Sequence, residues 1–185
     1  SFSPLPIPLS FLSSSGQVTL VKEGKPYVMF GDGTLAACKP ISESDLAKFI
    51  SDAVMDPKLA NRVLPIGGPS VAGGAWTAAA QGKLLFDLAK KPEKFIRVPV
   101  AIMDFVISIL SSLSKIFPGL VDAAEFGRIG RYYATESMLV WDAAKGCYDA
   151  EATPEYGTDT LEAFFEKALK DGGLEGQELG DAAIF

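Results

Sequence analysis

The chain has 185 residues, a net charge of −6 and no histidine. Hydrophobic residues make up 48% of it and charged residues 22%, which is typical of a globular protein and excludes a disordered one. An acidic chain without a basic cluster argues against nucleic acid as a partner. The absence of imidazole excludes Ser-His-Asp and Cys-His catalysis and the common histidine-dependent zinc sites. The cysteines Cys38 and Cys147 form no CxxC motif, so they predict neither a metal site nor a disulfide framework.

The two ends of the chain differ in composition from the middle. Residues 1–16 are rich in serine and contain prolines at alternate positions, which favour an extended backbone. We expect this segment to be an arm at the start of a chain that is processed or cut; if it is ordered, it is expected to lie against another chain or a membrane. Residues 17–172 are predicted to form one domain, and residues 173–185 an acidic, glycine-rich tail. No run of 18 uncharged apolar residues predicts a membrane-spanning helix.

Short apolar runs follow the arm. The β-branched run 18–21 and the run 27–30 favour strands on either side of a turn at Glu23–Pro26, and residues 35–38 form a further short run. A helix then begins at Ser42, which can cap it. Its apolar residues have the spacing of a stripe that faces a core; they are Leu46, Phe49, Ile50, Ala53 and Val54. It ends at Asp56–Pro57.

The proline-containing run 62–66 predicts an edge strand. Glycine-rich residues 67–74 come next and precede a helix, which is where phosphate-binding loops occur. The loop matches neither GxGxxG nor GxxxxGK[ST], and Pro69 lacks a backbone N–H. A phosphate cradle and a plain connection both stay open at this point.

Two further helices are separated by a strand. Thr77 can cap a helix that runs to about Lys90, and residues 95–98 predict a strand. Pro99 suits the first position of the next helix, which Pro118–Gly119 ends. Its stripe favours a core helix or, with its serine-rich opposite face, a helix half-sunk in a membrane interface. The stripe consists of Ile102, Phe105, Val106, Ile109, Leu110, Leu113, Ile116 and Phe117.

The last third repeats the alternation of helix and strand. Residues 123–130 predict a helix, 138–141 a strand and 142–149 a turn or hairpin. Asp159 and Glu162 have the spacing of a capping box for a final helix. That helix faces inward with Leu161, Phe164, Phe165, Ala168 and Leu169, and Gly172–Gly173 stops it. Short strands alternating with amphipathic helices predict an α/β fold, or α+β if the chain is a fragment.

Residues 125–133 hold the densest group of polar and aromatic side chains. Arginines there can pair with a ligand carboxylate, and aromatic rings can stack on a flat ligand. The candidate substrate-binding residues are Phe126, Arg128, Arg131, Tyr132 and Tyr133. The alternative is structural, with the arginines paired to Glu125, Glu136 or Asp122 and the aromatic rings in the core.

No tyrosine is followed by a lysine four residues later, so the Tyr-x-x-x-Lys pair of short-chain reductases is absent. No residue is predicted to be catalytic, to bind a cofactor or to bind a metal.

Several stretches resemble the divinyl chlorophyllide 8-vinyl-reductase family of plants and algae. They follow one another in order from about Gln17 to Phe185. They are GKPYVMFGDG (24–33), CKPIS (38–42), VLPIGGP (63–69), IMDF (102–105), AEFGRIGRYYATESM (124–138), YGTDTL (156–161) and GQELG (176–180).

That family is similar to the atypical short-chain dehydrogenases, in which a dinucleotide-binding Rossmann half precedes a substrate-facing half. This chain resembles the second half only. The implied activity is NADPH-dependent reduction of the 8-vinyl group of a chlorophyll precursor. The chain departs from the pattern in three places: an Arg-Pro-Thr stretch expected before residue 17 is replaced, the glycine loop near Gly73 is longer, and Ala78 stands where proline is expected.

The resemblance implies a chlorophyllide-type tetrapyrrole as substrate and a chloroplast location, at the stromal face or the periphery of the thylakoid or envelope membrane. NADPH is implied for the full-length family and is not expected to bind this chain alone. The chain is therefore interpreted as the substrate-side portion of such a reductase. The alternative is a shortened, non-catalytic relative that serves as a binding or scaffold subunit of a photosynthetic complex in or on the thylakoid.

Overall fold

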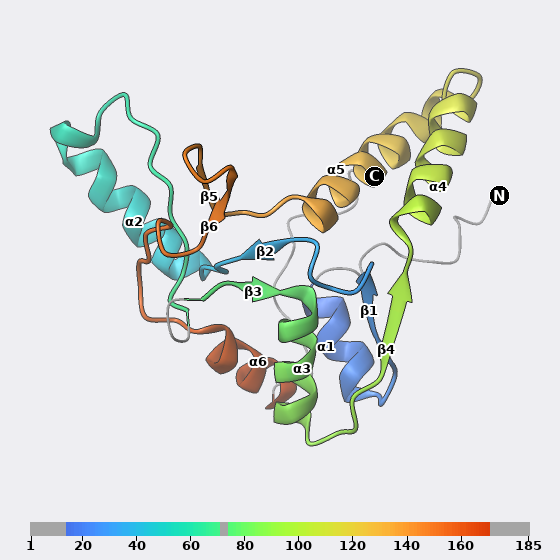
Figure 1. Ribbon diagram of the computed structural model, residues 1–185, viewed down its shortest axis with the longest axis horizontal. Coiled ribbons are helices and arrows are strands. Elements are labelled where there is room, and N and C mark those ends of the chain that lie inside the picture. Colours follow the sequence, from blue (N-terminus) through green and yellow to red (C-terminus); the bar gives the residue numbers. More distant parts are fainter. Residues whose placement is uncertain (1–13, 71–73, 171–185) are drawn as a thin grey trace.

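The computed structural model describes residues 14–70 and 74–170 (Figure 1). The helices are α1 (Ser14–Lys22), α2 (Glu43–Met55), α3 (Ala78–Ala89), α4 (Val100–Leu113), α5 (Val121–Thr135) and α6 (Leu161–Lys170), with 3-10 turns at Pro57–Leu59 and Pro118–Leu120. The strands are β1 (Tyr27–Phe30), β2 (Ala37–Cys38), β3 (Trp76–Thr77), β4 (Phe95–Val98), β5 (Val140–Asp142) and β6 (Cys147–Asp149). Residues 1–13 of the predicted arm, the tail 173–185 and the helix stop at Gly172–Gly173 lie outside the described residues.

The described strands pair two by two. β1 pairs with β4 in parallel, β2 with β3 and β5 with β6 antiparallel. A two-stranded sheet is at best marginally stable by itself, so helix packing has to supply most of the stability. The mixture of helices and short strands agrees with the predicted α/β class. The strands predicted at 27–30 and 95–98 and the hairpin at 142–149 are confirmed.

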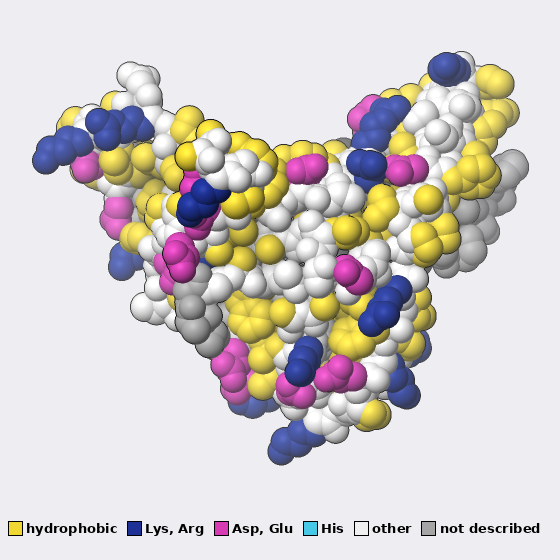
Figure 2. Space-filling view, viewed as in Figure 1, with side chains coloured by type: hydrophobic (Ala, Val, Ile, Leu, Met, Phe, Trp, Pro, Cys, Tyr) yellow, Lys and Arg dark blue, Asp and Glu magenta, His cyan; other side chains and the backbone are white. Residues whose placement is uncertain are grey.

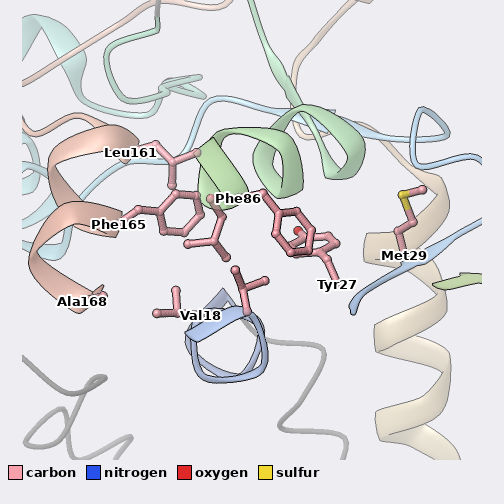
Figure 3. Close-up of a cluster of buried hydrophobic side chains, with 9 residues drawn as sticks. Val18, Tyr27, Met29, Phe86, Leu161, Phe165 and Ala168 are labelled. Atoms are coloured by element: carbon pink, nitrogen blue, oxygen red, sulfur yellow. The ribbon is translucent and has the colours of Figure 1, made fainter. Parts of the chain in front are cut away.

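The buried core lies where α1, α3 and α6 pack on one another and on β1 (Figure 3). Its largest fully buried side chains are Val18, Val21, Leu85, Phe86 and Phe165. The inward face predicted for the last helix is confirmed, because Leu161, Phe165 and Ala168 are buried there and Phe164 and Leu169 pack against the cluster. The core is therefore built by three helices from distant parts of the sequence.

The strand predicted at residues 18–21 is wrong, because these residues form part of α1. Valine favours strands only weakly, and burial outweighs that preference: Val18 and Val21 are three residues apart, lie on one helix face and are completely buried. α1 begins at Ser14, inside the range predicted as the arm. Its Gln17 amide bonds both the N–H and the C=O of Val28 at 3.0 Å, which closes the free edge of β1 at that residue.

Two helices predicted to face a core are largely exposed. Ser42 caps α2 as predicted, with its hydroxyl accepting from the Asp45 N–H at 3.1 Å, but α2 buries no residue and Val54 is 78% exposed. On α4, Phe105 is 66% exposed and the one buried residue is Met103. The core expectation for both stripes is wrong because α2 and the α4–α5 pair extend away from the three-helix core in two directions (Figure 1).

Two local predictions also fail. Residues 62–66 form no strand, and Val63 is 94% exposed, because no described segment pairs with them. The Asp159–Glu162 capping box is wrong, because the hydroxyl of Thr160 accepts from the Ala163 N–H at 3.2 Å. The Asp159 carboxylate instead accepts hydrogen bonds from Ser42 and Ser44 at 2.7 and 2.8 Å, which ties the start of α6 to the start of α2.

We expect Phe165→Ala to lower the free energy of unfolding by about 3–5 kcal/mol, because it leaves a cavity between three helices. Val54→Ala on exposed α2 is the matched control and should change it by less than about 0.5 kcal/mol. Urea unfolding followed by circular dichroism measures both. Equal losses for the two variants would contradict the assignment of the core.

Candidate functional site

All five residues predicted to bind substrate lie on α5, but on two sides of it. Successive helix residues are about 100° apart, so Phe126 and Tyr133, seven residues apart, share one side. Arg128 and Arg131 lie round the other side, where Arg131 faces α4 across the pair. Tyr132 lies between the two groups, and its ring meets that of Tyr133 edge to face at 5.9 Å. The five side chains therefore do not form a single pocket. The aromatic rings are not core residues either, since all three are 44–62% exposed.

Both arginines are already engaged in ion pairs. Arg131 Nε donates to Asp104 of α4, while Arg128 donates to Glu125 and to the Ser111 hydroxyl. Glu125 was among the partners that the structural alternative predicted, and Asp104 was not. All four charged side chains are about half exposed. Since exposed ion pairs contribute little, a ligand carboxylate can compete for either guanidinium.

Tyr132 lies at the C-terminal end of α5, close to the β5–β6 hairpin. The Tyr148 hydroxyl donates to Glu136 Oε2 at 2.9 Å, and the rings of Trp141 and Tyr148 meet edge to face at 5.1 Å. The hydrogen bond to Glu136, together with partial burial and the nearby charge of Glu136 and phenol of Tyr132, raises the pKa of Tyr148. We refer to Tyr132, Glu136, Trp141 and Tyr148 as the aromatic cluster.

The sequence contained only part of the signal for this cluster. Trp141 and Tyr148 are cross-strand partners in the observed hairpin, in which Asp142 pairs with Cys147. The predicted turn or hairpin at 142–149 includes Tyr148 but not Trp141, so it did not place the two rings side by side. The approach of Tyr148 to Glu136 depends on how the hairpin folds back on α5. No local sequence pattern encodes that contact, and sequence reasoning missed it.

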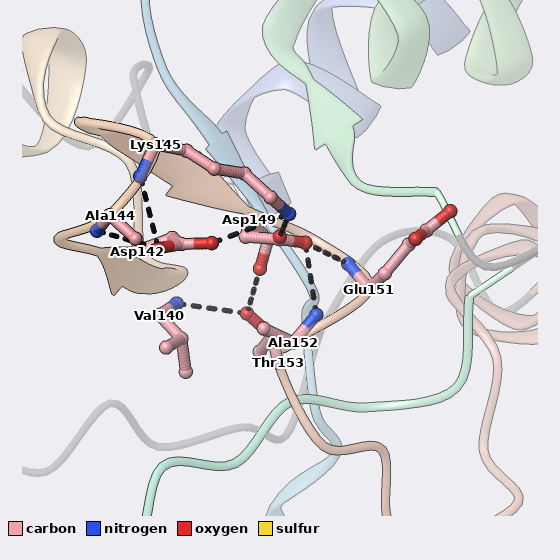
Figure 4. Close-up of polar contacts among 8 residues, drawn as sticks. All are labelled: Val140, Asp142, Ala144, Lys145, Asp149, Glu151, Ala152 and Thr153. Atoms are coloured by element: carbon pink, nitrogen blue, oxygen red, sulfur yellow. Dashed lines mark hydrogen bonds and ion pairs between the residues drawn. The ribbon is translucent and has the colours of Figure 1, made fainter.

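The hairpin itself is held by a lysine between two carboxylates (Figure 4). Lys145 Nζ lies 2.5 Å from Asp149 and 3.3 Å from Asp142, and this pairing lowers the pKa of Asp149. Asp142 also accepts the N–H groups of Ala144 and Lys145, and Gly146 adopts the positive φ that the turn needs. The hairpin therefore presents Trp141 and Tyr148 from a fixed turn.

The aromatic cluster adjoins a hollow on the surface. In Figure 1 the β5–β6 hairpin lies between α2 and α5, and Figure 2 shows the surface hollowed between these two parts. The segment that joins α5 to the hairpin is bonded to β2: the Ala37 N–H donates to Ser137 Oγ at 3.0 Å, and the Met138 N–H donates to the Ala37 carbonyl at 2.8 Å. Charged side chains of the α4–α5 pair lie along the edge of the same hollow (Figure 2).

This arrangement offers exposed aromatic rings with cations beside them. Trp141 and Tyr132 expose about half of their surface, and Arg128 lies four residues from Tyr132 on the same side of α5. Such a surface can stack on a planar ring and pair with its carboxylate. Within residues 14–70 and 74–170, no group of three or more acidic or cysteine side chains is placed to hold a metal ion. In the same residues, no helix is both long and apolar enough to cross a bilayer.

Comparison with known proteins identifies related sequences along almost the whole chain. No family model matches it. Divinyl chlorophyllide a 8-vinyl-reductase of Zea mays is 59% identical over 175 residues, that of Oryza sativa subsp. indica 57% over 175, and that of Arabidopsis thaliana 58% over 171. These alignments cover 95%, 95% and 92% of this chain and 43%, 42% and 40% of the relatives.

By sequence, the chain is a homologue of part of these divinyl chlorophyllide a 8-vinyl-reductases. The family resemblance read from its motifs is confirmed. The chain spans less than half the length of the curated relatives that it matches. All three names describe the relatives as chloroplastic.

Several of the stretches on which the resemblance was read meet one another in the fold. Met103 and Asp104 of IMDF contact the AEFGRIGRYYATESM helix, where a Cβ on Gly130 would lie 3.3 Å from Met103 and where Arg131 pairs with Asp104. Gly68 of VLPIGGP lies against CKPIS so closely that a Cβ would come within 1.9 Å of the Pro40 carbonyl. These motifs therefore maintain helix and loop packing.

The backbone hydrogen bonds of Gly67 and Gly68 bear on whether the glycine-rich loop 67–74 can bind a phosphate. The Gly67 N–H donates to the Pro154 carbonyl at 2.9 Å, and the Gly68 N–H donates to the Lys39 carbonyl at 3.1 Å. Both amides are satisfied by the protein itself, which favours a structural connection at these two glycines. Residues 71–73 of the loop lie outside the described residues.

A buried lysine stabilises the loop that contains Gly67 and Gly68. Lys39 Nζ, on a side chain only 2% exposed, pairs with Glu155 at 2.7 Å and donates to the Thr153 carbonyl at 3.2 Å. Glu155 also accepts a hydrogen bond from Ser70. The hydrogen bonds from Lys39 and Ser70 lower the pKa of Glu155 to about 2. A charged lysine in this position depends on the ionised carboxylate.

We expect acid to destabilise the fold through Glu155. Because its folded pKa is depressed, its contribution is fully present above its ordinary pKa of 4.5 and is lost as the pH falls toward about 2. Glu155→Gln should lower the midpoint of thermal unfolding at pH 7, and the gap to the wild type should shrink below pH 4.5. Unfolding midpoints measured from pH 7 to pH 2 test this. A gap that is constant over that range would show that the Lys39–Glu155 pair does not stabilise the fold.

Proposed function

We propose that this chain is the substrate-side part of a reductase that converts the 8-vinyl group of a divinyl chlorophyllide into an ethyl group. The observation that carries the proposal is the 57–59% identity to divinyl chlorophyllide a 8-vinyl-reductases over more than nine tenths of the chain. The reaction adds one hydride and one proton across the vinyl double bond. The comparisons give no support to the alternative of a non-catalytic scaffold subunit.

The hollow between α2 and α5 is the proposed place for the pigment. A chlorophyllide is a flat, largely apolar macrocycle that carries a propionate. The ring would lie on the aromatic cluster, where Trp141 is 54% and Tyr132 56% exposed. The propionate would exchange into one of the exposed ion pairs of Arg128 or Arg131. Phe126, on the other side of α5, is left out of this site, and Tyr133 adjoins it only through the edge-to-face contact of its ring with Tyr132.

The hydride source belongs to a part of the enzyme that this chain does not contain. We propose NADPH bound by a Rossmann-type half, because the sequence has neither a dinucleotide fingerprint nor a Tyr-x-x-x-Lys pair. The relatives are more than twice the length of the matched region, which leaves room for such a half. The chloroplast is the proposed location, at the stromal face or a membrane periphery.

A chimera tests the proposed activity. We expect the Zea mays reductase, with its matched 175-residue region replaced by this chain's, to convert divinyl chlorophyllide a to the 8-ethyl product when NADPH is supplied. Chromatography of the pigments measures the conversion. Trp141→Ala should raise KM for the pigment about tenfold, whereas Trp141→Phe, which keeps a ring, should retain most of the affinity.

A folded chimera without reductase activity would contradict the proposed function. An active chimera in which Trp141→Ala leaves KM unchanged would instead contradict only the proposed pigment site. Circular dichroism and gel filtration of each variant establish that it is folded.

The arginines are tested by the charge of the ligand. Of Arg128→Ala and Arg131→Ala, we expect the variant that removes the partner of the propionate to weaken binding of free-acid chlorophyllide by roughly tenfold to a hundredfold, and the other to change it little. Binding of the propionate methyl ester should change little. Quenching of pigment fluorescence gives both affinities. Equal losses for acid and ester would show that the arginines serve only the ion pairs with Glu125 and Asp104.

A further inference from the structure

α2 and the segment that follows it carry apolar side chains that no described part of the chain covers. α2 buries none of its residues, and Ile50, Val54 and Met55 are 53–80% exposed. Val63, in the segment after α2, is 94% exposed. Figure 1 shows α2 at one edge of the molecule, away from the core that α1, α3 and α6 form. That core therefore cannot cover these side chains.

α2 contacts the rest of the described chain on one side only. The Tyr156 hydroxyl donates to Asp52 at 2.6 Å, and Asp45 accepts two backbone N–H groups from the segment before α6 at 2.9 and 3.0 Å. At about 100° per residue, Ile50 and Val54 lie on the opposite side of the helix from Asp45 and Asp52. The apolar side of α2 is therefore left open while its polar side is held in place.

The backbone of residues 62–66 has no partner either. Within residues 14–70 and 74–170, no backbone hydrogen bond involves this segment. Pairing begins at Gly67, whose N–H donates to the Pro154 carbonyl and whose carbonyl accepts from the Tyr156 N–H, both at 2.9 Å. This contact is a parallel β-bridge between Gly67 and Glu155. The apolar run that was predicted as an edge strand therefore leads directly into strand-like pairing, but it lacks a neighbouring strand of its own.

α2 and residues 62–66 have the form of one helix-and-strand unit of an α/β fold. The segment turns back to the start of α2, because Gly68 lies against Pro40 and Ile41. In α/β folds a helix covers one face of a sheet with its apolar side, and the strand next to it in sequence belongs to that sheet. The described sheets have two strands each, and none of them contains residues 62–66. The sheet to which this unit belongs is therefore not among those of the described residues.

The exposed backbone identifies a β-sheet as the missing neighbour. A lipid surface has no hydrogen-bonding groups for an extended backbone, and a helix uses its own along its length. The edge of a sheet offers both N–H and C=O groups. Pro65 lacks an N–H, which suits an edge strand whose proline side faces solvent. In such a strand Leu64 and Ile66 point their backbone groups to the other edge, so pairing is expected through them.

The relatives indicate which sheet this is. The matched regions make up only 40–43% of the three reductases, so most of such a protein lies outside the part that resembles this chain. The proposed function assigns a Rossmann-type half to that remainder. Such a half is built on a sheet that helices cover on both faces. A sheet of this kind is what α2 and residues 62–66 lack.

We propose that residues 62–66 add an edge strand to the sheet of the dinucleotide-binding half, and that α2 covers the face of that sheet beside them. The proposal rests on the proposed function, because it requires that such a half belongs to the protein. This chain then contributes a helix and a strand to the cofactor half as well as the substrate side. Because α2 also lies on one side of the hollow, the contact brings the nicotinamide-binding half beside the proposed pigment site.

Hydrogen exchange, measured residue by residue, tests the proposal. The 185-residue chain is compared with the Zea mays chimera that carries the matched region of this chain. We expect the Leu64 and Ile66 N–H groups to exchange freely in the chain and at least about a hundredfold more slowly in the chimera, because they are hydrogen-bonded only there. The Val63 N–H, on the side of Pro65, should stay unprotected in both.

Three variants separate docking from folding. Val63→Asp and Val54→Glu should abolish the protection in the chimera, because each places a carboxylate in a contact without water. Both side chains are exposed in the 185-residue chain, so neither variant should change its thermal midpoint. Lys48→Glu reverses a charge on the other side of α2 and should keep the protection.

Free exchange of Leu64 and Ile66 in a folded chimera would overturn the proposal, whether or not the chimera reduces divinyl chlorophyllide. Loss of protection in Lys48→Glu to the same extent as in Val54→Glu would also contradict it. Protection that already exists in the 185-residue chain and rises with its concentration would assign the strand edge to a second copy instead. Protection in a chimera without reductase activity would support the contact between the halves and contradict only the proposed function.

Discussion

The burial of five side chains, Val18, Val21, Leu85, Phe86 and Phe165, is the constraint from which the rest of the described structure follows. They come from three helices that are distant in sequence, and they hold the short parallel pair β1–β4 against those helices. Gln17, next to Val18, closes the β1 edge at Val28 with both of its amide groups. A core of this size cannot also cover α2, α4 and α5. The exposed apolar faces of those helices are therefore a consequence of the small core.

Features set by neighbouring residues could be predicted from the sequence. Ser42 and Thr77 cap their helices through hydroxyls that accept an N–H three residues later, which is a purely local contact. The hairpin at 142–149 follows from Asp142, Gly146 and Asp149 in the same way. Features that depend on distant partners were mispredicted. Residues 18–21 form a helix because of burial by α3 and α6, and Asp159 was given a cap role although it binds Ser42 and Ser44 of another element.

The apolar stripes show a second limit of sequence reasoning. The spacing of Ile102, Val106 and Ile109 correctly predicts that one side of α4 is apolar. The spacing does not predict what covers that side. The expectation that the protein core covers it was wrong. For the candidate site, the density of polar and aromatic residues in the sequence drew attention to the segment that forms α5. It did not show that the predicted residues lie on different sides of that helix. Phe126 and Arg131 are five positions apart, which is about 140° of rotation, so that separation was available from helix geometry alone.

The proposed pigment site and the exposed apolar side chains lie on the same helix, α5. Arg128 bonds Ser111 of α4 on one side of the helix, while Phe126 and Ile129 are exposed apolar side chains on the other, and Tyr132 lies between them with its ring against that of Tyr133. α5 packs chiefly on α4, so the position of Tyr132 and Glu136 relative to the hairpin depends on a helix pair that the core does not hold directly. The exposed apolar side of α4 and α5 and the placement of the pigment surface are therefore linked, because whatever covers those side chains would also restrain the helix pair that carries Tyr132.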